Sequence, residues 1–205
     1  VESFRPGVLG ASGLEPDAIC ERFPRLILAS ITGYGQDGPL AKEPGHDLNF
    51  AGYSGIVAAT QGHAPHPVQV ADLGGGALTA CLAIVAALYG RERSGVGARL
   101  DVSMTEGALA LMAPHLATAR AENRNLKPGS ELLAGGLANY RSYACRDGKQ
   151  ICFAALEPKF WMGFAEAVGE PVVPDSDALE ALFLKRDRSE WLAVLSGLCV
   201  TPALT

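Results

Sequence analysis

Apolar runs alternate with helical patterns over the first part of the chain. Residues 26–31 are almost continuously apolar and lie between a proline and a glycine, which is typical of a buried parallel strand. Residues 99–104, which follow a turn at 93–97, form a second strand pattern. Helical patterns surround the two runs at residues 16–23, 47–59 and 105–120. The alternation predicts an α/β domain with parallel strands.

The pattern changes in the second part of the chain. Residues 123–136 are rich in Asn, Pro, Gly and Ser, which indicates a boundary. Beyond it, two strand patterns at 139–145 and 150–155 flank a turn, and helical patterns follow at 158–168, 177–183 and 189–195. We therefore predict a portion of a large α/β domain at 1–122, a linker at 123–136 and a small α+β domain at 137–205.

One uncharged segment, residues 73–90, is just long enough to be tested as a membrane span. It contains four glycines, and Asp72 precedes it while Arg91 follows it, an order that suits a helix dipole. These features favour a buried helix, and we expect no membrane partner.

The composition narrows the class of protein. Apolar residues make up 48% of the 205 residues and charged residues 19%, which argues against a disordered or coiled-coil chain. The net charge is −5 without a basic stripe, so we expect no nucleic-acid partner. The five cysteines show no CxxC spacing, which favours free thiols and a cytoplasmic location. Both ends stop within a pattern, and we expect a piece of a longer protein.

Familiar ligand motifs are weak or missing. Residues 33–38 match GxGxxG after a strand, but Pro39 stands where a dinucleotide site needs a helix. A flexible loop is the better interpretation. The histidines at 46, 63, 66 and 115 lack metal-ligand spacing, so we predict no metal site.

Asp72 is the most informative single residue. One interpretation is an N-cap for the apolar helix that follows it. The other is a functional carboxylate beside a glycine-rich first turn, where a ligand approaches closely and exposed N–H groups hold an oxyanion. His46 and Glu157 also allow a purely structural interpretation. His46 would then be a histidine in a surface loop, and Glu157 a carboxylate at the start of a helix.

Five ordered phrases resemble the family III CoA-transferases (CaiB/BaiF), and most of all the racemase branch of that family. The phrases are Thr-Gly-Tyr-Gly-Gln-Asp-Gly-Pro at 32–39, Pro-Gly-His-Asp at 44–47, Ala-Asp-Leu-Gly-Gly-Gly at 71–76, Arg-Ser-Gly-Val-Gly at 93–97 and Leu-Glu-Pro at 156–158. The resemblance implies part of a large parallel-sheet domain followed by a small α+β domain, within a longer protein that forms an interlocked homodimer.

The resemblance also implies roles for single residues. Asp72 matches the catalytic aspartate shared by the family, His46 stands where the racemase branch has histidine, and Glu157 matches the glutamate that supports it. The implied contacts to CoA are Phe4, Arg5, Ile31, Thr32, Gly33, Tyr34, Gly74 and Gly75. A basic residue that usually meets the CoA phosphates is replaced by Ala11.

The activity implied first is racemisation of a 2-methylacyl-CoA thioester, with His46 and Asp72 as proton carriers on opposite faces of the α-carbon. The partner is the acyl-CoA substrate, and no cofactor is implied beyond its CoA moiety. Two alternatives remain. One is a CoA-transferase in which Asp72 forms a mixed anhydride, and the other is a truncated, non-catalytic fragment.

Overall fold

The computed structural model describes residues 1–62 and 65–204 and has a mixed α/β fold. It divides into two compact units, the first made of residues 1–58 and 62–126, the second of residues 59–61 and 127–205. The division falls inside the predicted linker 123–136, and most of that linker groups with the second unit.

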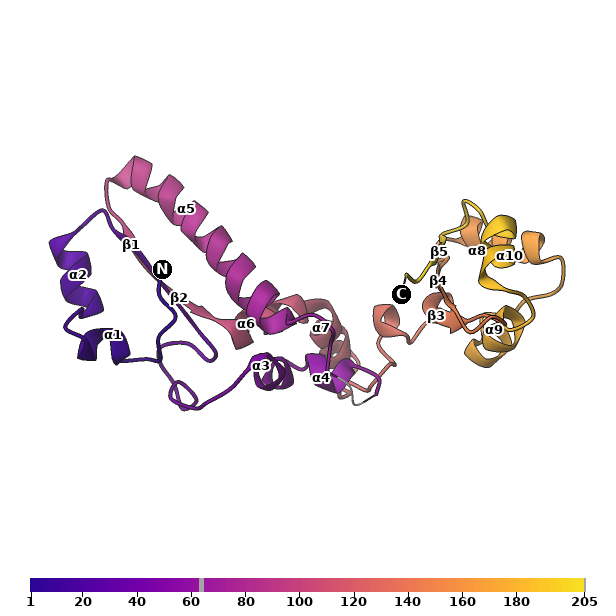
Figure 1. The fold of residues 1–205 in the computed structure, drawn as a ribbon, viewed down its shortest axis with the longest axis horizontal. Coiled ribbons are helices and arrows are strands. Elements are labelled where there is room, and N and C mark those ends of the chain that lie inside the picture. Colours follow the sequence, from indigo (N-terminus) through magenta and orange to yellow (C-terminus); the bar gives the residue numbers. More distant parts are fainter. Residues whose placement is uncertain (63–64, 205) are drawn as a thin grey trace. The chain divides into compact units, whose positions relative to one another are not determined.

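The first unit is built on two parallel strands, β1 (Ile27–Thr32) and β2 (Ala98–Ser103), which pair from Ile27 opposite Ala98 to Thr32 opposite Ser103. Glu2 pairs with the free edge of β1 through its backbone. Helices fill the rest of the unit (Figure 1): α1 (Val8–Ala11), α2 (Pro16–Arg22), α3 (Asp47–Tyr53), α4 (Ile56–Ala59), the π-helix η1 (Ala71–Leu78), α5 (Thr79–Ser94), α6 (Met104–Leu111) and α7 (Ala113–Ala121).

Two predicted helices of this unit are divided in the structure. The pattern over 47–59 becomes α3 and α4, because Gly55 adopts φ +87° between them. The pattern over 105–120 becomes α6 and α7, with Met112 between them and Pro114 in the first turn of α7.

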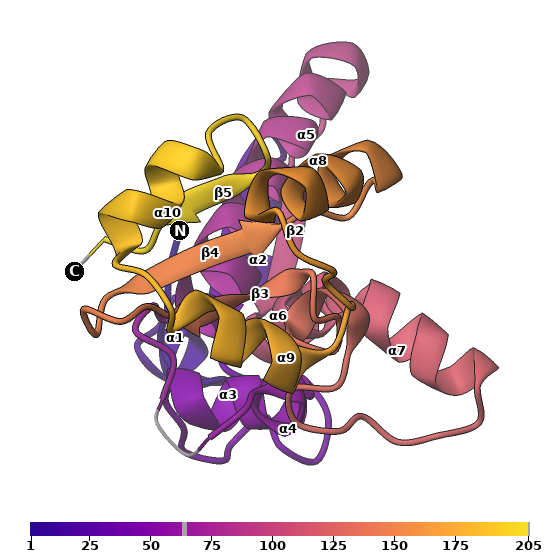
Figure 2. The same ribbon diagram turned by 90° about the vertical axis from the view of Figure 1, so that its right-hand side faces the viewer.

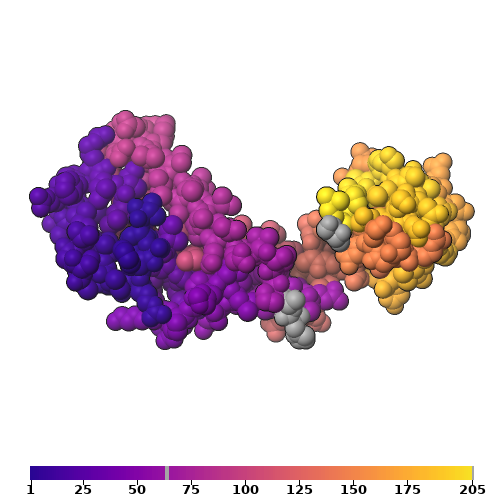
Figure 3. Space-filling view, viewed as in Figure 1, coloured from indigo at the N-terminus to yellow at the C-terminus, as the bar shows by residue number. Residues whose placement is uncertain are grey.

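The long helix that continues from η1 into α5 is more exposed than we predicted. Residues 71–94 form the one described helix long and apolar enough to cross a membrane, and only 22% of its most apolar window is buried. Leu82, Val85 and Tyr89 are 72%, 62% and 66% exposed. The prediction of a buried helix is wrong for this chain, because α5 packs on β1 and β2 with one face only (Figures 1 and 3). The expected homodimer stays a prediction.

The second unit is a three-stranded antiparallel sheet in the order β3 (Tyr140–Ala144), β4 (Gln150–Ala154), β5 (Val200–Pro202). The 3-10 turn η2 (Leu132–Ala134) precedes the sheet. Figure 2 shows the helices α8 (Pro158–Val168), α9 (Ser176–Phe183) and α10 (Arg188–Val194) around it.

An aromatic cluster forms the core of the second unit. Phe153 on β4 lies 4.5 Å from Phe164 on α8 between ring centroids, and Phe183 lies 5.4 Å from Trp191 in an edge-on contact. The Trp191 indole N–H donates to the Phe183 carbonyl at 2.8 Å. All four side chains are at most 1% exposed, so this unit has the larger apolar core.

Candidate active site

A cavity of about 240 Å³ opens at the carboxyl ends of β1 and β2, where open α/β sheets bind ligands. Three segments of the chain and two single residues line it. The segments are residues 3–6, residues 31–34 at the end of β1, and lining residues between residue 41 and Phe50, and the single residues are Asp72 and Met104.

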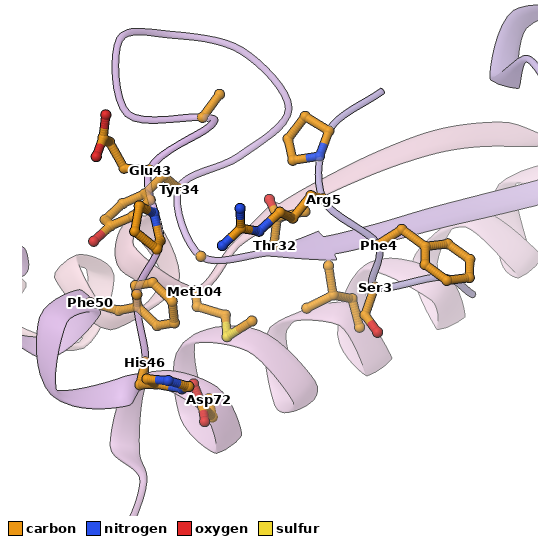
Figure 4. A pocket seen from close by; sticks show the side chains of 16 residues that line it. Ser3, Phe4, Arg5, Thr32, Tyr34, Glu43, His46, Phe50, Asp72 and Met104 are labelled. Carbon is orange, nitrogen blue, oxygen red and sulfur yellow. The ribbon is translucent and has the colours of Figure 1, made fainter. Parts of the chain in front are cut away.

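His46 and Asp72 meet on one side of this cavity. Figure 4 shows the imidazole of His46 against the carboxylate of Asp72. His46 is the extended N-cap residue of α3, and Asp72 stands in the first turn of η1. His46 is exposed and Asp72 is half-buried, so a substrate can reach both groups from solvent.

The helix start that carries Asp72 is capped by a different aspartate. One oxygen of the Asp47 carboxylate, Oδ1, accepts the backbone N–H of Ala71 at 2.7 Å and that of Asp72 at 2.9 Å. The N-cap interpretation of Asp72 is therefore wrong, because the N-cap residue of η1 is Val70. Asp72 is the second residue of η1, and Asp47 is the first residue of α3, whose N-cap is His46.

Burial raises the pKa of the Asp72 carboxyl above its ordinary value. The negative charge of Asp47 raises it further, and His46 lowers it by a smaller amount. The protonated form of Asp72 is therefore favoured more than in a solvated aspartate. A carboxyl that alternates between its charged and neutral forms suits proton transfer near neutral pH.

The glycines after Asp72 serve helix packing. A Cβ at Gly75 would overlap the Met104 carbonyl and lie 2.6 Å from the Ala108 nitrogen on α6. Of the residues that the structure describes, Gly74 and Gly75 are outside the cavity lining, although we predicted that they contact CoA. The first two N–H groups of this helix start donate to Asp47 and are therefore not open to an oxyanion.

The other residues predicted to contact CoA line the cavity together: Phe4, Arg5, Ile31, Thr32, Gly33 and Tyr34. In Figure 4 the guanidinium of Arg5 reaches over Thr32, whereas the ring of Phe4 points away from this group. The Thr32 hydroxyl is buried and has no hydrogen-bond partner among the described residues. An unpaired buried hydroxyl costs free energy, so it favours a polar ligand atom here.

Three lining or supporting residues escaped the sequence analysis: Phe50, Met104 and Asp47. Phe50 lies one turn after His46 on α3, and the edge of its ring meets Tyr34 at 5.1 Å between centroids. Phe50 follows His46 by four residues, and this helical spacing predicts that both side chains lie on the same face. Met104 follows β2 directly, so its position at the carboxyl end of a strand could also be predicted from the sequence. No nearby sequence pattern predicts that the Asp47 side chain hydrogen-bonds to the backbone of η1.

Glu157 belongs to the second unit, where it is the exposed N-cap residue of α8 and its side chain makes no capping hydrogen bond. Its support of His46 stays a prediction. The described residues contain no group of three or more His, Cys, Asp or Glu side chains that could hold a metal ion. His63, one of the four histidines considered for metal binding, lies outside the described residues.

Comparisons with known proteins agree over almost the whole chain. The family model for CoA-transferase family III matches residues 1–203. The chain is 33% identical to alpha-methylacyl-CoA racemase of Mus musculus over 100% of this chain and 58% of the mouse protein. It is 44% identical to acetyl-CoA:oxalate CoA-transferase of Acetobacter aceti over 54% of this chain and 30% of that protein.

Solved structures show the same relationship. A CAIB/BAIF family protein from Brucella suis superposes with a TM-score of 0.79 at 26% identity, covering 100% of this chain and 59% of the other. The chain therefore spans 58% of the length of the mouse racemase and 59% of the Brucella suis structure.

Proposed function

The chain belongs to CoA-transferase family III, and on this premise we propose that it acts as an acyl-CoA racemase that inverts the α-carbon of a 2-methylacyl-CoA thioester. The observation that carries the proposal is the meeting of His46 and Asp72 in one open cavity. The racemase of Mus musculus, 33% identical over the full chain, gives further support.

Inversion needs two proton carriers and no redox step. One group takes the α-proton, and the electron pair of that C–H bond is held in the enolate of the thioester. The other group returns a proton to the opposite face, and the next turnover runs in reverse. His46 supplies an imidazole, whose ring nitrogens can accept and donate a proton. Asp72 has a raised pKa, which allows it to act as the acid in one direction.

The cavity also supports binding of the CoA thioester. Arg5 supplies a positive charge, and the unpaired hydroxyl of Thr32 supplies a hydrogen-bonding group for an amide or carbonyl of the ligand. Tyr34 adds an aromatic wall that is fixed by its edge-on contact with Phe50. We propose these residues as part of the CoA subsite.

We expect the wild-type chain to exchange the α-hydrogen of a racemic 2-methylacyl-CoA in D₂O and to racemise a single enantiomer. His46→Ala should lower both rates by about 10²- to 10⁴-fold, the usual contribution of a general acid–base group. Proton NMR of the α-position measures exchange, and chiral chromatography measures inversion. His115→Ala on α7, a histidine outside the cavity lining, is the matched control. Full-rate exchange by His46→Ala would rule out the racemase assignment.

A CoA-transferase is the second candidate, favoured by the 44% identity to the oxalate enzyme of Acetobacter aceti over 116 residues. In that reaction the Asp72 carboxylate attacks the thioester carbonyl, forms an acyl anhydride and expels the CoA thiolate. Hydroxylamine then converts the trapped aspartyl group to a hydroxamate that mass spectrometry locates. A labelled Asp72 with transfer retained in His46→Ala would favour transfer, whereas a folded chain that binds no CoA by calorimetry would favour a non-catalytic fragment.

A further inference from the structure

One carboxylate outside the predicted catalytic set joins the two segments that carry His46 and Asp72. Asp47 follows His46 directly, and its Oδ1 accepts both the Ala71 and the Asp72 N–H groups across separations of 24 and 25 residues. These hydrogen bonds thus connect Asp47, the neighbour of His46 in the sequence, directly to the backbone of Asp72.

This use of the Asp47 side chain differs from ordinary capping. An aspartate at a helix start commonly accepts an N–H of its own first turn. At the start of α3, Asn49 makes the capping hydrogen bond instead, because its side-chain oxygen accepts the His46 N–H at 3.1 Å. Asp47 is thereby left to satisfy two first-turn donors of another helix, through charge-assisted bonds that are stronger than neutral ones.

We propose that Asp47 is a positioning residue that holds the Asp72 carboxylate opposite the His46 imidazole. The proposal rests on the proposed racemase function, in which these two side chains serve opposite faces of one carbon. Displacement of a reacting group by about 1 Å can cost about 10²-fold in rate, so a short tie between the two segments matters for catalysis.

The negative charge of Asp47 supports the same role as its hydrogen bonds, because it also prepares Asp72 for proton transfer. It raises the pKa of Asp72 and so favours the protonated form that one direction of racemisation needs. Of the groups near Asp72, Asp47 raises its pKa and His46 lowers it. The other charged residues of the cavity wall and of the elements packed against η1 are Arg5, Glu43, Arg91, Glu92, Arg93, Arg99, Asp101 and Glu106.

Two substitutions separate position from charge. Asp47→Asn keeps an acceptor oxygen for the two N–H groups and removes the charge, so the pKa of Asp72 should fall. Asp47→Ala removes the acceptor as well, and kcat for α-proton exchange should fall by about 10²-fold with KM for the acyl-CoA almost unchanged. Circular dichroism checks that each variant is folded.

The experiment titrates the full chain, labelled with ¹³C at the aspartate carboxyl carbons, by NMR and measures α-deuterium exchange on the same samples. The control is Asp175→Asn in the second unit, which alters a similar carboxylate bond to the Ala178 N–H at 2.9 Å. It should leave the pKa of Asp72 and the exchange rate unchanged.

The two proposals can fail separately. If the pKa of Asp72 is equal in wild type and Asp47→Asn, or if folded Asp47→Ala exchanges at the wild-type rate, the role of Asp47 is overturned. If the pKa of Asp72 falls as expected but the wild-type chain exchanges no α-hydrogen, the racemase function is overturned and the contact of Asp47 with the Asp72 segment stands.

Discussion

Asp72→Asn should reduce α-proton exchange by roughly 10³- to 10⁴-fold, the upper range for a general acid–base group. The amide neither takes nor returns a proton at neutral pH, and it is no nucleophile for a thioester. The variant should therefore lose racemisation and acyl transfer alike, whereas His46→Ala loses only racemisation. Isotope exchange and hydroxylamine trapping on the two variants give this contrast directly. An Asp72→Asn variant that retains either activity would contradict the site.

The same substitution should not destabilise the fold. The pKa of Asp72 is raised by burial and by Asp47, so the folded chain binds this proton more tightly than the unfolded chain, where the aspartate pKa is about 3.9. The stability contributed by Asp72 consequently falls as pH rises from the unfolded pKa through the raised folded pKa, and the penalty is complete above it.

Asparagine carries no charge and avoids this penalty. Asp72→Asn should melt at the same temperature as wild type or higher at pH 7, and the difference should shrink as the pH falls toward 4. Thermal unfolding across this range, followed by circular dichroism, tests the sign. A lower melting temperature at pH 7 would show that the Asp72 carboxylate stabilises the fold.

Local patterns predicted most of the secondary structure because those elements are determined by nearby residues. The apolar run that becomes β1 and the proline-started helix α8 both appear within a residue or two of their predicted bounds. The first turn of η1 differs, since its capping carboxylate comes from Asp47, 25 residues earlier. No local pattern shows an acceptor from another helix, so the N-cap was one of the two interpretations that the sequence left open for Asp72.

The site was predictable only in part for the same reason. Spacing alone gives no ground for placing His46 beside Asp72, and the expectation came from family resemblance. The apolar pattern of α5 marks a face that packs, but periodicity does not say whether the covering surface lies in the same chain. Leu82 and Val85 are exposed here because the described elements cover only the opposite face.

The glycine run shows how one sequence signal supports two physical interpretations. Glycine allows close approach of either a ligand or another backbone. At Gly75 the neighbour is α6, and at Gly107 on α6 a Cβ would overlap the Gly75 carbonyl in return. The two helices meet glycine against glycine, which brings the start of α6 and its Met104 next to the segment that carries Asp72.

Gly75→Ala should therefore lower the free energy of unfolding of the first unit by about 2 kcal/mol. Alanine has a helix propensity about 1 kcal/mol more favourable than glycine. Its methyl group, however, would collide with backbone atoms of Met104 and Ala108, which cannot move aside as a side chain can. Overpacking of this kind costs about 1–3 kcal/mol or more. Because Asp72 stands one turn earlier, separation of η1 from α6 should also reduce kcat.

Gly90→Ala is the matched control, since Gly90 lies inside α5 and a Cβ there meets no atom within 4 Å. It should stabilise the chain by up to about 1 kcal/mol. Both tryptophans, Trp161 and Trp191, lie in the second unit, so their fluorescence reports that unit while far-UV circular dichroism reports both. In urea, Gly75→Ala should shift the dichroism transition more than the fluorescence transition. Equal stability of Gly75→Ala and Gly90→Ala would show that the contact between η1 and α6 is looser than the backbone geometry indicates.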